Sequence, residues 1–334
     1  MVSLLFKKNC HWLLHLGPAN WASTMTFAQI ATLFDIEGVE GCQNTVAYAP
    51  PKNPVGCDNT QSSQLPKREE FKGHVIFFPG DIQDFTDKMK ENYQCRDYVD
   101  WSYENTINLI CNKFPHSHVW LLSPSKKAYN TICVYKNFVK SKSVMGVPSH
   151  RQNYFGLNHL ELIMKNAMNK ILPNKPYDQD YLKQECPIIV AGFSKGCIVL
   201  NQFLYEVSSF DPCCEIEPNE EETDTLKFDK PNIDFLNRIK MLMWLDGGHS
   251  GEEDNWVCDE NVIRALLKSP LSKADFHIHV TPYQVRDPHR PWKGESEAEF
   301  VKLLKENGLH VEEKLYFEEE NPTIDLHFQI LLEF

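Results

Sequence analysis

The sequence lacks several features that would place it in other classes of protein. None of its 334 residues lies in an apolar run that approaches 18 residues, so no transmembrane helix is indicated. No N-x-S/T sequon occurs, since a proline excludes Asn321-Pro322-Thr323, and this disfavours secretion. Positive charge is also scarce. The 34 Lys and Arg against 46 Asp and Glu give a net charge of −12, which argues against general nucleic-acid binding.

The cysteines form neither a metal-binding pattern nor a disulfide framework. There are 11 of them, scattered between Cys10 and Cys258, and no two are spaced as C-x-x-C. An odd number of scattered cysteines indicates free thiols in a reducing compartment. We therefore expect no zinc site and no cofactor.

Acidic residues are absent from the N-terminal segment 1–34, which carries Lys7 and Lys8 among many apolar residues. A weakly basic, amphipathic start without acid is typical of a mitochondrial transit peptide, although the segment also lacks arginine. The alternatives are a secretory signal, whose apolar run the two lysines interrupt, and a disordered N-terminus. We interpret 1–34 as a targeting leader, with the mitochondrial matrix as the destination and the cytoplasm as the alternative.

The remaining chain alternates between expected strands and helices. Residues 35–73 are rich in proline, glycine and small polar residues, and are interpreted as a linker or covering segment. From 74 to 334 the apolar runs and helical periodicities alternate, as a parallel sheet with helices on both faces requires. Because 42% of the chain is apolar, this part can form one large α/β domain.

One stretch, residues 187–204, organises this domain. Ile188 to Ala191 is an apolar run of strand length, and an apolar helical pattern begins at Cys197. Between them lies Gly192-Phe193-Ser194-Lys195-Gly196. A strand, a sharp turn with a serine at its apex and a helix form the nucleophile elbow of serine hydrolases. The alternative is a glycine-rich turn whose serine only caps the helix.

A serine nucleophile needs a histidine base and an acid that orients it. His327 follows the last expected strand, where a loop would return it to Ser194; the alternative is a surface histidine. Two acids follow strands: Asp287 after the penultimate strand and Asp246 after the one before it. We favour Asp287, because its place after the penultimate strand matches the hydrolase template. Asp287-Pro-His-Arg-Pro291 also resembles the Asp-Pro-x-x-Pro loop that carries the acid in many esterases and thioesterases. Asp246 is the alternative acid, or a residue of an Asp-Gly turn.

Backbone N–H groups near the serine would stabilise an oxyanion. We expect one from Lys195 at the start of the helix. The loop after the strand 74–78 would supply a second, from Asp81 or Ile82, with Gly80 allowing the backbone to approach; the alternative is an ordinary turn that ends the strand. The Asp81 carboxylate would oppose the charge that develops there.

Two further segments stand out by charge. From Asn105 to Leu160 there is no acidic residue, and 7 Lys and Arg lie in this gap. We interpret 125–158 as a lid with a basic rim that attracts an anionic substrate, or else as an ordinary solvated surface. Residues 211–232 are dense in acid and are interpreted as a mobile insertion.

Two histidines in one strand raise the question of a metal site. His277 and His279 alternate along the run Asp275 to Thr281, so both face one side of the sheet. No third ligand is apparent from the sequence, and we expect them to line a sheet face instead of binding metal.

The motifs together resemble those of known hydrolases. Gly-Phe-Ser-Lys-Gly is similar to the Gly-Phe-Ser-Gln-Gly elbow of acyl-protein thioesterases and small carboxylesterases. The run from Phe-Phe-Pro-Gly-Asp81 to Trp-Leu-Asp-Gly-Gly-His249 resembles the animal family of the chromosome 2 open reading frame 69 protein. That resemblance implies an α/β-hydrolase fold from about residue 74 onwards and a mitochondrial location. It implies a site but not a substrate.

The sequence therefore predicts a serine hydrolase of an ester or thioester. Ser194 would attack, His327 would move the proton, and Asp287 would orient His327. We expect a small acyl or lipid-like substrate, anionic if the basic rim serves it. The rival hypothesis is a hydrolase-fold protein that has lost turnover and binds a partner, because fold alone does not fix function.

Overall fold

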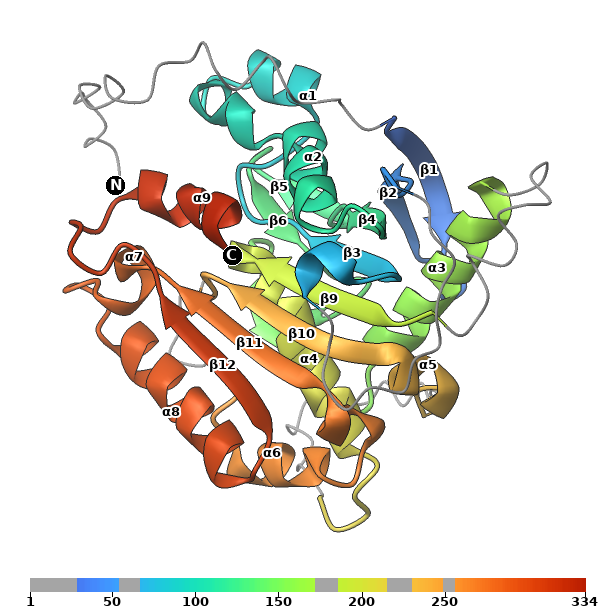
Figure 1. Cartoon of the computed structure of the whole chain (residues 1–334), viewed down its shortest axis with the longest axis vertical. Coiled ribbons are helices and arrows are strands. Elements are labelled where there is room, and N and C mark those ends of the chain that lie inside the picture. Colours follow the sequence, from blue (N-terminus) through green and yellow to red (C-terminus); the bar gives the residue numbers. More distant parts are fainter. Residues whose placement is uncertain (1–28, 54–66, 172–185, 215–229, 249–255) are drawn as a thin grey trace.

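The computed structural model describes residues 29–53, 67–171, 186–214, 230–248 and 256–334 (Figure 1). An eight-stranded sheet crosses the molecule in the order β1-β2-β4-β3-β9-β10-β11-β12. Strand β2 is antiparallel to β1 and β4, and the other neighbouring pairs are parallel. The strands are Ala31–Glu37 (β1), Gln43–Ala49 (β2), His74–Phe78 (β3), His118–Leu122 (β4), Ile188–Phe193 (β9), Ile239–Leu245 (β10), Asp275–Val280 (β11) and His310–Leu315 (β12).

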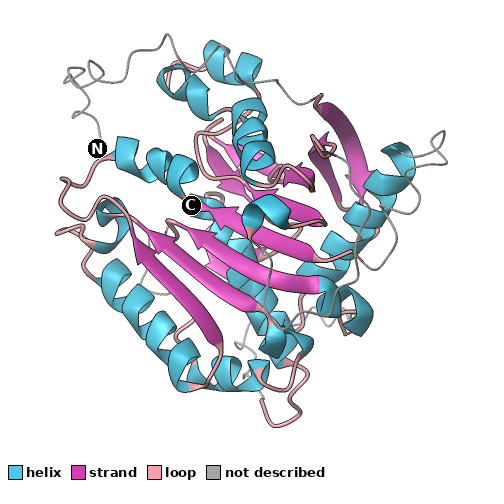
Figure 2. Ribbon diagram, viewed as in Figure 1, coloured by secondary structure: helices cyan, strands magenta, loops and turns pink. Residues whose placement is uncertain are grey.

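Helices surround the sheet (Figure 2). They are Thr86–Glu91 (α1), Tyr103–Lys113 (α2), Gly156–Ile171 (α3), Cys197–Ser208 (α4), Ile233–Arg238 (α5), Glu260–Leu266 (α6), Pro282–Val285 (α7), Trp292–Glu306 (α8) and Ile324–Glu333 (α9). Short 3-10 helices cover Arg68–Glu70, Arg96–Trp101, Ser194–Gly196 and Pro270–Lys273. No described helix combines the length and apolar character needed to cross a bilayer.

Strand β9 shows why both faces of the sheet are covered. Its side chains alternate, so Ile188 and Val190 join one apolar cluster while Ile189, Ala191 and Phe193 join the other. The first cluster includes residues of α3, α4, α6 and α8, and the second includes residues of α2 and α9 (Figure 1). A strand that is apolar on both faces belongs at the centre of such a three-layer structure.

The strand order and the strand–turn–helix at the end of β9 make this an α/β-hydrolase fold, as predicted. The start of the sheet was predicted wrongly. Strands β1 and β2 lie within the intervals interpreted as leader and covering segment, because Val46, Ala47 and Ala49 are apolar and fully buried beside β4. Residues 1–28 of the expected leader, and residues 215–229 of the expected acidic insertion, lie outside the described residues.

Candidate active site

The elbow after β9 places Ser194 at the end of a central strand. Strand β9 ends at Phe193, a single 3-10 turn follows, and α4 begins at Cys197. Ser194 has a φ of 55°, which is the left-handed region that only glycine enters freely. A non-glycine residue there is strained by about 1–3 kcal/mol and is found mostly at functional sites.

The two glycines of the motif are required by close backbone contacts. A Cβ atom on Gly192 would lie 2.8 Å from the carbonyl carbon of Gly196. A Cβ atom on Gly196 would lie 2.1 Å from the carbonyl oxygen of Phe78, in the neighbouring strand β3. The sequence motif is therefore a steric requirement of the turn, which packs against β3 with no room for side chains.

His327 reaches the same region from the first turn of α9, not from a loop as predicted. Thr323 caps this helix by accepting the Leu326 N–H. The Nδ1 atom of His327 lies 2.6 Å from Oδ2 of Asp246, and both residues are buried. Since a carboxylate only accepts, Nδ1–H donates and Nε2 is left with its lone pair. This is the tautomer that a general base requires.

Asp246 is fixed at the end of β10 by two further hydrogen bonds. Its Oδ1 accepts the backbone N–H of Thr281 at 2.6 Å, and its Oδ2 accepts the Thr281 hydroxyl at 2.8 Å. Burial raises the pKa of Asp246 above its ordinary value, whereas the hydrogen bonds from His327 and Thr281 act to lower it. The φ of Asp246, 50°, again places a non-glycine residue in the left-handed region.

The structure does not bring Asp287 to His327, so our preferred acid was wrong in position. After β11 the chain turns into α7, which carries Asp287 away from β11. The Asp287 carboxylate pairs with Arg290 instead, at 2.5 Å from Nη2 and 2.6 Å from Nε. Burial raises the pKa of Asp287, but the hydrogen bonds from His289 and Arg290 outweigh it and hold the pKa below its ordinary value.

Ser194 and His327 line one pocket of about 360 Å³. Its other lining residues are Asp81, Ile82, Thr131, Ile132, Tyr283, Arg290, Ile324 and Phe328. The His327 ring stacks on Phe193, with ring centroids 4.6 Å apart, and Tyr283 lies on it at 5.1 Å. These contacts hold the imidazole in one orientation within a site that admits a small ligand.

The oxyanion loop, residues Gly80 to Ile82, is closer to the serine than the sequence could show. A Cβ atom on Gly80 would lie 2.7 Å from Cβ of Ser194, so glycine permits this approach. The Gly80 N–H donates to Oε1 of Gln83, and the Ile82 N–H donates to the carbonyl oxygen of Thr131. Of the expected loop donors, Asp81 N–H is therefore the one without a recorded acceptor in the described chain.

The Asp81 carboxylate is held by its own partners. Its Oδ1 accepts the backbone N–H of Cys133 at 2.6 Å. Burial raises the pKa of Asp81, and the positive charge of Lys195 is the largest influence that lowers it. The negative charge of the Asp81 carboxylate is thus partly neutralised by the Cys133 N–H and by Lys195.

The segment predicted as a lid, 125–158, contains two hairpins, and the first contributes residues to this site. Strands Lys126–Ala128 (β5) and Ile132–Val134 (β6) form the first, and Lys140–Ser141 (β7) and Pro148–Ser149 (β8) form the second. Thr131 and Ile132 line the Ser194 pocket. The buried Lys195 donates from Nζ to the Met145 carbonyl at 3.2 Å. One wall of the pocket therefore comes from this segment.

A possible metal-ligand set exists elsewhere, contrary to our expectation that no third ligand was present. Ligand atoms of His277, His279 and Glu312 lie within 4.8 Å of one another. However, Arg68 Nη2 lies 3.5 Å from Nε2 of His279, and Tyr316 OH lies 3.0 Å from its Nδ1. Burial lowers the pKa of His279 to about 2, with Arg68 as the next cause. A metal ion would have to displace this guanidinium, so the set fits a cation poorly.

Sequence reasoning missed three residues of the site. Thr281 follows β11 directly and fixes Asp246, and its position at a strand end was the available signal. Arg290 and Tyr283 line the pocket from the chain after β11. Nothing in the sequence distinguishes them from other polar loop residues, because their role depends on how α7 folds back.

Comparison with known proteins gives a family but little from solved structures. The crystal structure of an uncharacterised protein from Capnocytophaga ochracea matches with a TM-score of 0.42 and 10% identity, covering 91% of this chain and 62% of that one. So low a score carries no argument, and the fold rests on the strand order.

The sequence relatives are much closer. The mitochondrial protein C2orf69 homolog of Danio rerio is 35% identical over 286 residues, 83% of this chain and 76% of that protein. The mitochondrial protein C2orf69 of Homo sapiens is 31% identical over 304 residues, 77% of this chain and 73% of that protein. The C2orf69 family model matches residues 32–187 and 179–310. The chain therefore belongs to the C2orf69 family.

Proposed function

We propose that the protein is a serine hydrolase that cleaves an ester or thioester through an acyl-enzyme. The observation that carries this proposal is the buried His327–Asp246 pair, whose histidine lines the same pocket as Ser194. Burying a carboxylate costs free energy, and an apolar side chain of similar size would fill the same space without that cost. Ser194, which follows β9 and has a strained backbone, lines the same pocket as His327 of α9, and Asp246 at the end of β10 holds His327. This combination has a purpose in acyl transfer.

The reaction follows from the tautomer of His327. Its Nε2 takes the Ser194 proton while Oγ attacks the carbonyl carbon of the substrate, and Asp246 stabilises the imidazolium that forms. When the tetrahedral intermediate collapses, His327 gives this proton to the departing alcohol or thiol. Water then repeats the sequence on the acyl-enzyme, which releases a carboxylic acid and regenerates Ser194.

The N–H groups of Lys195 and Asp81 would hold the oxyanion. Lys195 lies in the turn Ser194–Gly196 that leads into α4, where the amide dipoles favour negative charge. Asp81 lies in the loop that Gly80 brings against Ser194. The Asp81 carboxylate accepts a hydrogen bond from the Cys133 N–H, so the main-chain N–H of Asp81 remains available to a different partner.

Covalent labelling tests this proposal directly. We expect a fluorophosphonate probe, which reacts with activated serines, to label the full chain at Ser194. The Ser194→Ala variant removes one buried oxygen and should remain folded but unlabelled. A folded wild-type protein that resists labelling would contradict turnover and favour the rival function, a hydrolase fold that binds a partner.

The substrate is proposed to carry negative charge near the scissile bond. Arg290 lines the Ser194 pocket, and Asp287 holds its guanidinium in place. An arginine positioned by a carboxylate presents its remaining N–H groups in a fixed direction. The exposed lysines of the acid-free segment, Lys136, Lys140 and Lys142, would add a longer-range field.

Substituting Arg290 by glutamine should therefore change substrate preference. We expect kcat/KM for an anionic ester to fall about tenfold, as for a lost charge-assisted hydrogen bond, and that for a neutral ester of equal length to stay unchanged. Added salt should lower only the anionic rate, because the field is screened over about 8 Å. The matched control is Arg286→Gln, since Arg286 pairs with Glu318 and does not line the pocket. Equal losses for both esters would refute a charge-based preference.

The relatives' names include the word mitochondrial, and the acid-free start of this chain fits import. We infer that this protein acts in mitochondria, in the matrix. A chain that begins at residue 29 keeps β1 and β2 and should fold but stay outside mitochondria. Import of this shortened chain, followed by fractionation, would show that the address lies elsewhere.

A further inference from the structure

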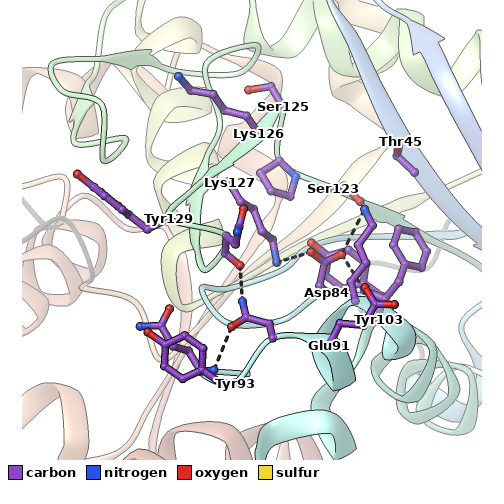
Figure 3. A pocket seen from close by; sticks show the side chains of 16 residues that line it. Thr45, Asp84, Glu91, Tyr93, Tyr103, Ser123, Ser125, Lys126, Lys127 and Tyr129 are labelled. Atoms are coloured by element: carbon purple, nitrogen blue, oxygen red, sulfur yellow. Dashed lines mark hydrogen bonds and ion pairs between the residues drawn. The ribbon is translucent and has the colours of Figure 1, made fainter. Parts of the chain in front are cut away.

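A second, larger pocket is lined mostly by residues that follow the oxyanion loop in the chain, from Asp84 onwards (Figure 3). It has a volume of about 1010 Å³, and its walls are α1 with the residues up to Gln94, and the segment from Ser123 to Asn130. The backbone hydrogen bond from Ile82 to Thr131, 2.8 Å long, joins the loop to the β5–β6 hairpin between this pocket and that of Ser194. The volume is at the upper end of the range for small-molecule sites.

Two buried hydroxyl groups line this pocket without a partner. Tyr103 OH and Ser123 Oγ form no hydrogen bond with any described residue, although Tyr103 is only 1% exposed and Ser123 8%. The two hydroxyl groups do not meet in standard hydrogen-bond geometry. Burial raises the pKa of Tyr103 well above its usual range, and Ser123, which is close enough to lower this pKa, offsets only part of the rise. The Tyr103 hydroxyl therefore keeps its proton and can donate. Such orphan groups are costly unless a ligand or water satisfies them.

The charges around the pocket leave one cation available. Asp84 is paired by Lys127, whose Nζ lies 3.1 Å from Oδ2, and Lys88 lies 3.9 Å from its Oδ1. Figure 3 shows Lys127 pointing at Asp84. The exposed Lys126 also lines the pocket and forms no ion pair within the described part of the chain. Glu91 is the other acid of the lining, so the walls carry three cations and two carboxylates.

Two tyrosines at the rim are unusually exposed. Tyr93 and Tyr129 are 74% and 72% exposed, and both line the pocket. In Figure 3 they lie on one side of the view, with Thr45 and Tyr103 on the other. Two exposed aromatic rings beside one pocket offer flat faces on which a planar group can stack.

We propose that this pocket binds a nucleotide, with its base against Tyr93 or Tyr129, its phosphate at Lys126 and its ribose hydroxyls within reach of Tyr103 and Ser123. A nucleoside monophosphate has a flat aromatic ring, neighbouring hydroxyl groups and a phosphate dianion. The exposed tyrosines, the two buried hydroxyl groups and Lys126 would each bind one of these three groups. The site is separate from Ser194, and it stands whether or not the protein is a hydrolase.

Calorimetric titration of the full chain tests the class of ligand. AMP, adenosine and ribose 5-phosphate are titrated separately, because the second lacks the phosphate and the third lacks the base. We expect AMP to bind at least tenfold more tightly than either fragment. The absence of AMP binding at millimolar concentration, or equal affinity for AMP and ribose 5-phosphate, would overturn the proposal.

Variants then locate the site. Tyr103→Phe removes an unpartnered hydroxyl, so the melting temperature should stay or rise while AMP binds about tenfold more weakly. Lys126→Gln should weaken AMP but not adenosine. The matched control Lys136→Gln, an exposed lysine of the same segment outside the pocket, should leave AMP affinity unchanged. Unchanged AMP affinity in Tyr103→Phe and Lys126→Gln, or an equal loss in Lys136→Gln, would place AMP elsewhere.

Discussion

Asp246→Asn is expected to lower kcat about 10⁴-fold, the loss found when the acid of a well-studied triad becomes an amide. The amide can donate a hydrogen bond to Nδ1 of His327, which favours the tautomer that carries its proton on Nε2. Nε2 can then no longer accept the proton of Ser194. Steady-state kinetics on an activated ester would measure this loss. Circular dichroism should show an unchanged fold, because the substitution preserves the size of a fully buried side chain.

Asp287→Asn is the matched control and should change kcat less than tenfold. Asp287 binds Arg290, not His327, so its loss should act mainly on KM for an anionic ester. Fluorophosphonate labelling gives a second readout, since it should nearly vanish in Asp246→Asn and persist in Asp287→Asn. The reverse pattern would return the role of the acid to Asp287 and contradict the geometry.

The fold could be predicted because its signals are local. Strand β9 is apolar on both faces, with one glycine near its end and another in the turn that follows. Gly192 lies against the backbone of Gly196, and Gly196 lies against the backbone of Phe78, so neither position has room for a side chain. Such constraints appear in consecutive residues, where periodicity and turn chemistry reveal them. Strands β1 and β2 were missed for the opposite reason. They lie at one end of the sheet, directly before the three prolines of residues 50–54, and β1 is mostly exposed.

The acid could not be chosen from sequence because it depends on two turns. Asp246 and Asp287 both follow strands, and the usual order of elements favours the second. The short helix α7, which begins with Pro282, carries Asp287 away, whereas Thr281 holds Asp246 against His327. For a residue that follows a strand, the path of the loop decides which side chain it contacts. The spacing of residues in the sequence does not reveal that path.

The oxyanion loop illustrates the same limit on a smaller scale. Sequence could place Gly80, Asp81 and Ile82 after β3, but it could not show which N–H group is free. Gln83 and Thr131 accept two of them, and Thr131 comes from a hairpin 49 positions after Ile82. Long-range hydrogen bonds of this kind decide the chemistry of a loop after the fold has formed.

The elbow itself should be intolerant of a single methyl group. In Gly196→Ala the new Cβ would lie 2.1 Å from the Phe78 carbonyl oxygen and 2.7 Å from its carbonyl carbon. These are backbone atoms of β3, which lies between β4 and β9 in the sheet, so they cannot move aside as a side chain could. We expect the free energy of unfolding to fall by about 3 kcal/mol, at the upper end of overpacking costs.

The melting temperature of Gly196→Ala should accordingly fall by about 6–12 °C in a domain of this size, measured by calorimetry. Gly41→Ala is the matched control, because Gly41 has a φ of 76° and no atom lies within 4 Å of the added Cβ. The expected cost of Gly41→Ala in free energy of unfolding is that of the left-handed backbone alone, about 1–2 kcal/mol. If Gly196→Ala melts no lower than Gly41→Ala, the tight contact between the elbow and β3 is wrong. If it melts much lower, the glycine after Ser194 is fixed by packing, independently of any catalytic role for the serine.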